Sequence, residues 1–113
     1  MKRIYDFLKS KKINVYFPGQ HKGLCTEPYV VIHKRNQMAT NSNRLGVQGT
    51  DIILYVPHFS YIRAEDYEEK VRVIMRKLEF LRKTGFETPW ILDNDKKAFT
   101  KSMEYLIQKE LEG

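Results

Sequence analysis

Two apolar runs, YVVIHK at residues 29–34 and DIILYVP at residues 51–57, decide the fold of this chain. Both are rich in β-branched and aromatic residues, which favour strands. Their apolar side chains stand at consecutive positions, so each run predicts a strand that is covered on both faces inside a sheet. Pro57 ends the second run, because proline cannot donate a hydrogen bond to a strand ladder. We expect the two strands to pair antiparallel at the centre of the sheet.

The segment between the two runs, residues 35–50, is polar and contains three asparagines and two glycines. Asparagine and glycine are typical of turns and tolerate backbone with positive φ. The segment is therefore either a long, polar, flexible loop at about 36–50 or the splayed tip of a hairpin between the two strands.

Two segments have the spacing of amphipathic helices. In residues 1–10 and 64–83, apolar side chains recur every three to four positions. The longer helix would carry Arg82 and Lys83 in its last turn and end before Gly85. Its apolar stripe would consist of Tyr67, Val71, Ile74, Met75, Leu78 and Leu81.

Three further segments complete the predicted sheet. INVYF at residues 13–17 ends at a Pro-Gly turn, and WIL at residues 90–92 is another short apolar run. Apolar and polar residues alternate in KSMEYLIQKEL at residues 101–111, which favours a half-exposed strand. A helix is the alternative for this last segment, because lysine, glutamate, glutamine and leucine all favour one.

These elements predict one α+β domain over residues 1–113, an antiparallel sheet of about four to five strands with two helices packed against it. The composition agrees, since 42% of the residues are hydrophobic and 30% are charged. No apolar run approaches the length of a membrane span. Cys25 is the only cysteine of the sequence, which fits a reducing compartment, so we expect a cytoplasmic protein.

The stretch ILDNDKKAF at residues 91–99 is a candidate metal site, because Asp93 and Asp95 offer two carboxylates. An EF-hand loop that began at Asp93 would need an oxygen ligand at its fifth position and glycine at its sixth, where this chain has Lys97 and Ala98. Neighbouring lysines also oppose a cation. We therefore interpret the stretch as a turn, in which Asp and Asn side chains bond to nearby backbone.

Other patterns for catalysis or ligand binding are weak. His21 and Cys25, with His33 or His58 beyond them, lack the paired spacing of a zinc site. No phosphate-binding glycine loop and no nucleophile elbow occurs. The acidic residues at the start of the longer helix should form a solvated face, stabilised by the helix dipole: Glu65, Asp66, Glu68 and Glu69. The residue patterns thus predict no catalytic residue, no metal site and no cofactor.

The formal net charge is +6, which favours anionic partners. The basic residues are dispersed, and no block of five or six like charges occurs. A basic nucleic-acid-binding module is one alternative function. A metal-dependent nuclease is another, and its carboxylate and imidazole groups would be Asp93, Asp95, Glu104 and His58.

In the order of these signals, the chain resembles the tail terminator family, also called the tail-to-head joining family. Its members are small tail-completion proteins of long-tailed bacteriophages and prophages of Gram-positive bacteria. The resemblance covers nearly the whole chain. It rests on Pro28-Tyr29 opening a strand, Pro57 closing one, the acidic turn at 93–95, and Ser102 to Tyr105 in the last strand. It implies a non-enzymatic α+β virion protein that assembles as a ring, commonly a hexamer. The ring would cap the finished tail tube and then join the head.

The resemblance also implies the partners and the location. The partners would be further copies of the chain, the tail tube protein, a head-completion protein and DNA that passes through the ring, without a membrane. The protein would reside in the host cytoplasm during assembly and in the virion at the head–tail junction. A head-closure or connector component is a related alternative.

Two groups of residues are candidates for these contacts. The loop at 36–50, with Asn41, could order on binding its neighbours or the tail tube. Three basic residues either line a channel for DNA or are ordinary solvated residues: Lys34, Arg35 and Arg44. The turn residues could help to set subunit register by charge: Asp93, Asp95, Lys96 and Lys97.

Overall fold

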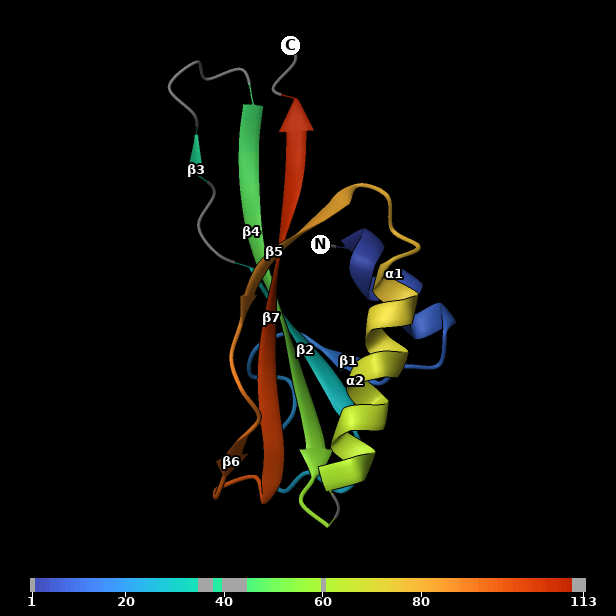
Figure 1. Cartoon of the computed structure of the whole chain (residues 1–113), viewed down its shortest axis with the longest axis vertical. Coiled ribbons are helices and arrows are strands. Elements are labelled where there is room, and N and C mark those ends of the chain that lie inside the picture. The colour runs from blue at the N-terminus through green and yellow to red at the C-terminus, as the bar shows by residue number, and fades with distance from the viewer. Residues whose placement is uncertain (1, 35–37, 40–44, 60, 111–113) are drawn as a thin grey trace.

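The computed structural model describes residues 2–34, 38–39, 45–59 and 61–110 (Figure 1). In chain order the elements are α1 (Lys2–Ser10), β1 (Val15–Tyr16), β2 (Tyr29–Lys34), β3 (Met38–Ala39), β4 (Leu45–Pro57), α2 (Tyr61–Met75), β5 (Leu81–Glu87), β6 (Ile91–Asp93) and β7 (Ala98–Glu110). The predicted α+β class is confirmed. The sheet is mostly antiparallel and has more strands than expected, seven in the described part of the chain.

The main path of the sheet runs β1-β2-β4-β7-β5, while β3 pairs with β4 and β6 with β7. The two apolar runs of the sequence form β2 and part of β4. They pair antiparallel, from Tyr29 opposite Tyr55 to Lys34 opposite Thr50, as predicted. β1 lies at the edge of the sheet and pairs parallel with β2.

β4 begins at Leu45, so residues 45–50 belong to a strand and not to the expected loop. Met38 and Ala39 of β3 pair with Val47 and Gly46 of β4. Of the two alternatives for the polar segment, the hairpin therefore fits its described part. Residues 35–37 and 40–44 lie outside the described residues.

The last segment is a strand, and the helical alternative is wrong. β7 pairs antiparallel with β4 along its whole length, from Ala98 opposite Pro57 to Glu110 opposite Leu45. The alternation of the sequence decided this correctly, because one face of β7 is buried and a strand places every second side chain on that face.

The longer helix begins three residues before the predicted start at residue 64 and ends well before the predicted end at residue 83. α2 ends at Met75, and residues 81–87, expected to be its last turn and C′ glycine, form β5. Leu81 pairs with Ile107 of β7, and Gly85, at φ +86°, lies where the register of β5 shifts. Leu78 and Leu81 continue the apolar spacing of the helix, yet they reach the core from a turn and a strand. Tertiary pairing with β7 outweighs the local preference.

Both helices cover the same face of the sheet, as Figure 1 shows. Alternate side chains of the central strands point towards the helices and form one apolar core. This core consists of Ile4, Leu8, Ile13, Val15, Val30, Ile32, Ile52, Leu54, Val71, Ile74, Met75, Met103, Tyr105 and Ile107. Within the described residues, no helix has both the length and the apolar character needed to cross a membrane.

A group of charged side chains joins α2 to the sheet. The Arg72 guanidinium donates to Glu68 one turn earlier and, at 2.7 Å, to Glu87 of β5. Lys101 of β7 lies 3.8 Å from Glu68 and 3.7 Å from Glu87, and Trp90 donates its indole N–H to Glu68 at 3.0 Å. The solvated-face prediction is therefore wrong for Glu68, since the sheet covers it. Glu65, Asp66 and Glu69 are exposed, as predicted.

The charges of this group stabilise one another. The hydrogen bond from Arg72 is the main reason that the pKa of Glu87 falls from 4.5 to about 2, while burial opposes the shift. The same bond raises the pKa of Arg72 above its ordinary value. Both groups are therefore charged at neutral pH, and ionised Glu87 stabilises the folded state.

We predict that Glu87→Gln destabilises the protein by about 2 kcal/mol at pH 7, because Arg72 and Lys101 then lose a half-buried charged partner. Glu87 binds a proton near pH 4.5 when unfolded and near pH 2 when folded, so its contribution is complete above about pH 4.5 and is lost as the pH falls towards 2. Urea unfolding at pH 7, 4 and 2 should show a shrinking gap between wild type and variant. The control is Glu65→Gln on the exposed face of α2; an equal loss in both variants would contradict the prediction.

Candidate interaction surface

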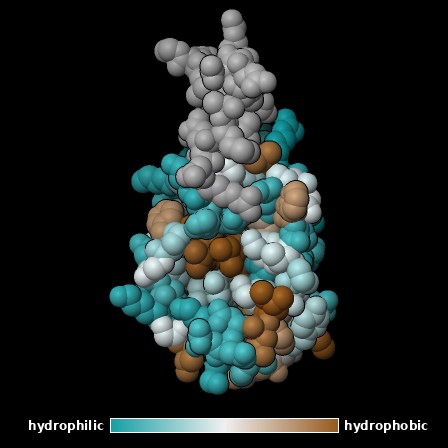
Figure 2. Space-filling model, turned by 90° about the vertical axis from the view of Figure 1, so that its left-hand side faces the viewer, coloured by the Kyte–Doolittle hydropathy of each residue, from teal (hydrophilic) through white to brown (hydrophobic). Residues whose placement is uncertain are grey.

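The sheet face away from the helices is only partly covered. The segment from Phe17 to Cys25 crosses one part of it, where Cys25, Tyr29 and Ala98 form a small second core. The remaining part holds a groove of about 360 Å³. Figure 2 views this side of the molecule and shows apolar surface near its middle and near the end that carries β6.

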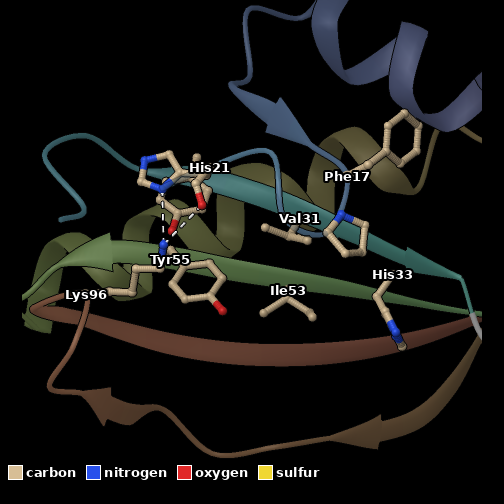
Figure 3. A pocket seen from close by; sticks show the side chains of 10 residues that line it. Phe17, His21, Val31, His33, Ile53, Tyr55 and Lys96 are labelled. Atoms are coloured by element: carbon tan, nitrogen blue, oxygen red, sulfur yellow. Dashed lines mark hydrogen bonds between the residues drawn. The ribbon is translucent and has the colours of Figure 1, made fainter. Parts of the chain in front are cut away.

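The groove has an apolar floor and polar ends (Figure 3). Val31 of β2 and Ile53 and Tyr55 of β4 form the floor, because odd-numbered residues of both strands face away from the helices. Phe17 and Pro18 line one wall. The sequence predicted strands covered on both faces, and in this region the second cover is incomplete.

Three stacked rings close one end of the groove. His21 stacks on Tyr29, with ring centroids 4.0 Å apart, and Tyr29 stacks on Tyr55 at 4.8 Å. The Lys96 ammonium donates to the His21 carbonyl oxygen at 3.2 Å. Burial, and then the charge of Lys96, lower the pKa of His21 below 6.5, so the ring is neutral at pH 7. His33 lies at the other end of the groove (Figure 3), where its Nδ1 is 3.5 Å from Asp51 Oδ2.

The stretch that suggested a metal site is an Asx turn. Asp93 Oδ1 accepts hydrogen bonds from the backbone N–H groups of Asp95, at 3.0 Å, and Lys96, at 3.1 Å. Lys97 adopts a left-handed φ of 51°. These contacts confirm the turn interpretation. In the described part of the chain, no group of three or more His, Cys, Asp or Glu residues is arranged to hold a metal ion.

This turn also connects three segments that are distant in the sequence. The carbonyl of Lys96 accepts a hydrogen bond from the Cys25 N–H at 2.9 Å, and the carbonyl of Lys97 accepts one from the His58 N–H at 3.3 Å. The loop before β2, the end of β4 and the β6–β7 turn are thereby held together. Lys96 and Lys97 thus have a structural role that the sequence did not reveal.

Cys25 is buried, and its thiol donates to the carbonyl of Glu27 at 3.3 Å. Burial is the main reason that its pKa rises from 9.0 to about 11, and the nearby Lys96 charge opposes the rise. Almost no thiolate is present at neutral pH, so this cysteine is a poor nucleophile and a poor metal ligand.

The structure brings only some of the predicted contact residues together. Lys96 lines the groove, and Asp93, Asp95 and Lys97 belong to the same turn. Lys34 lies elsewhere, because it pairs with Thr50 of β4, whereas the turn adjoins Ala98, the partner of Pro57. Thr50 and Pro57 are seven positions apart, which corresponds to about 23 Å along the strand. Arg35, Asn41 and Arg44 lie outside the described residues.

Apolar side chains are exposed at the end of the molecule where α2 begins and β6 turns into β7. They are Leu24, Phe59, Tyr61, Ile62, Ile91 and Leu92. Phe59 is 75% exposed and Ile62 is 68% exposed. Tyr61 packs edge-on against Phe99, whose register partner is Leu92. Apolar side chains that gather at one end of a protein are typical of an interaction surface, so this end is a candidate contact site.

Neither the groove nor this apolar end was located from the sequence. The consecutive apolar residues of β2 and β4 predict strands that are covered on both faces, so the sequence does not indicate that the floor residues border a groove. The run HFSYI at 58–62 is a detectable signal, since it places apolar residues directly after Pro57, where β4 ends.

Comparison with protein-family models gives no match, and comparison with curated protein sequences gives none either.

We predict that Asp93→Ala loosens the turn and makes Cys25 reactive. Loss of the Oδ1 acceptor removes the hydrogen bonds of the Asp95 and Lys96 N–H groups. The free energy of unfolding should therefore fall by about 1 kcal/mol. In the wild type, a thiol with a pKa of about 11 reacts with iodoacetamide at pH 8 about 100-fold more slowly than one with a pKa of 9.0. The variant should be alkylated at least several-fold faster. Asp95→Ala is the control, since it removes a neighbouring exposed carboxylate; equal rates in the two variants would argue against the role of Asp93.

Proposed function

We propose that this chain is a non-enzymatic structural protein of a bacteriophage or prophage tail. It forms a ring that terminates the tail tube and then joins the tube to the head. Its partners are further copies of itself, the tail tube protein and a head-completion protein. It works in the host cytoplasm during assembly and remains at the head–tail junction of the virion.

The observation that carries this proposal is the order of the elements in the chain. The resemblance to tail terminators rests on two strand boundaries, one acidic turn and the last strand, and the structure has a strand end, a turn or a strand at each of these positions. Tyr29 opens β2, Pro57 closes β4, Asp93 forms an acidic turn, and residues 102–105 lie in the last strand. The α+β fold with two helices on one sheet face also agrees with the family.

A projecting strand pair supports a role in assembly. β2 pairs with β4 only from Thr50 onwards, so residues 45–47 of β4 pair with residues 108–110 of β7 and with the two-residue β3. Figure 1 shows these ends of β4 and β7 extending beyond the helices. An isolated two-stranded ribbon is marginally stable in water, so pairing with a neighbouring copy would stabilise these strand ends.

The exposed apolar end gives independent support. Phe59, Ile62 and Leu92 contribute surface that a stable partner would remove from water. In a ring, each subunit uses two different patches, one for each neighbour. The apolar end and the groove are two such patches on different parts of this chain.

We predict that the purified protein forms rings when it is mixed with tail tubes of the phage or prophage that encodes it. Light scattering across a range of protein concentrations, with and without tubes, measures self-association and binding. Negative-stain microscopy should then show a ring at one end of each tube. A protein that remains monomeric at every concentration and does not bind tubes would contradict the proposal. Tubes from an unrelated phage are the control.

The basic residues Lys34, Arg35 and Arg44 are proposed to line the channel through which DNA passes. Lys34 is exposed at the end of β2 that is remote from the Asx turn. We predict that replacing all three with Glu reduces infectivity at least tenfold, because three acidic side chains in each subunit repel the DNA phosphates. The measurement is plaque formation by phage that carry the triple variant.

Two controls define this experiment. Circular dichroism and urea unfolding should show that the triple variant folds like the wild type. A matched triple Glu variant at exposed lysines elsewhere, Lys2, Lys9 and Lys11, should leave infectivity unchanged. Normal infectivity of the Lys34, Arg35 and Arg44 variant would exclude the channel role but leave the proposed ring intact.

A further inference from the structure

The outer face of α2 combines apolar and acidic side chains. Positions 62, 66, 69 and 73 follow helical spacing and point away from the buried positions 64 and 71. Ile62 and Val73 are exposed at the two ends of this face. The carboxylates between them are also exposed: Glu65, Asp66 and Glu69. Phe59, just before the helix, extends the apolar part.

The groove on the opposite face of the sheet has complementary chemistry. Its floor and wall are apolar, and the cation among its lining side chains is Lys96. At the other end of the groove, Asp51 Oδ2 lies 3.5 Å from His33 Nδ1, so the positive charge is confined to the end that carries Lys96. The volume of about 360 Å³ suits one or two large apolar side chains and is too small for a whole helix. An apolar side chain flanked by carboxylates on a helix is the kind of group that this groove would accept.

We propose that α2 of one copy docks onto the groove of the next copy. Phe59 and Ile62 enter the groove, and the acidic residues of the outer face approach Lys96 and its surroundings. This inference rests on the proposed ring and specifies which two surfaces meet in it.

The positions of the two surfaces determine how copies would follow one another. The buried side of α2 packs on the face of Val30 and Ile32, whereas the groove lies on the face of Val31 and Ile53. The docking surfaces therefore lie on opposite sides of the sheet within one subunit. Such an interface is heterologous, and each docked copy leaves a free groove or a free helix for another copy. Contacts of this type produce closed rings or open filaments rather than pairs.

Disulfide trapping tests the inference directly. In a Cys25→Ser background, Val31→Cys places one thiol in the groove, and Ile62→Cys places one on α2. Under mild oxidation, a mixture of the two variants should give mixed dimers in clear excess over dimers of either variant alone. One chain that carries both substitutions should give a ladder of covalent multimers. Ile53→Cys is a second groove position in case Val31→Cys folds poorly.

Two further variants sharpen the result. Phe86→Cys is the matched control, because Phe86 is 76% exposed and lies on β5, which β7 separates from the groove strand β4. It should not be trapped with the groove variant. Replacing Glu65, Asp66 and Glu69 with Lys should raise the concentration required for half-maximal trapping about tenfold, because like charges then meet at the groove.

The outcomes separate this inference from the proposed function. Rings on tail tubes without trapping between the groove and α2 would overturn the inference and leave the ring intact. Dimers of the Ile62→Cys variant alone that equal or exceed the mixed dimers would also overturn it, since the apolar end would then pair with itself. Trapped ladders in a protein that never binds tail tubes would support the inference and remove the tail function.

Discussion

The antiparallel pairing of β4 with β7 is the contact on which the other elements depend. Each strand has 13 residues, and the ladder extends from Leu45 to Pro57. One side of this pair gives β2 its partner, and the other side gives β5 and β6 theirs. Ile52 and Leu54 of β4 belong to the core that also contains the buried residues of both helices. Without this ladder, the groove would lose its floor and α2 would lose its support.

The sequence was sufficient where local pattern and tertiary environment agree. The β2–β4 pair was predicted because β-branched residues in both runs favour strands, and both runs lie inside the sheet. The strand at the C-terminal end was predicted because its alternation matches a sheet with one buried face. The Asx turn was predicted from side-chain chemistry that acts over two or three residues, as the hydrogen bonds of Asp93 Oδ1 confirm.

The sequence was insufficient where a residue's role depends on a distant partner. Leu81 has helical spacing from Leu78, yet it pairs with Ile107 of β7. Glu68 has the spacing of a solvated helix residue, yet Trp90 and Lys101 cover it. The groove had no pattern of its own, because its floor comes from two strands and its wall from the loop around Phe17. Such contacts exist only after the sheet has formed, and no short window of sequence contains them.

The place of β7 in the chain has a consequence for biosynthesis. β7 follows every other element of the described chain, yet it occupies the middle of the sheet between β4 and β5. During translation, β4 presents an unpaired edge until the ribosome has released residues 98–110, since no other strand occupies that position. The Cys25 N–H likewise has its hydrogen-bond acceptor, the Lys96 carbonyl, only after residue 96 has been synthesised. A nascent chain therefore cannot complete its core before β7 is available, because Met103, Tyr105 and Ile107 of β7 belong to that core.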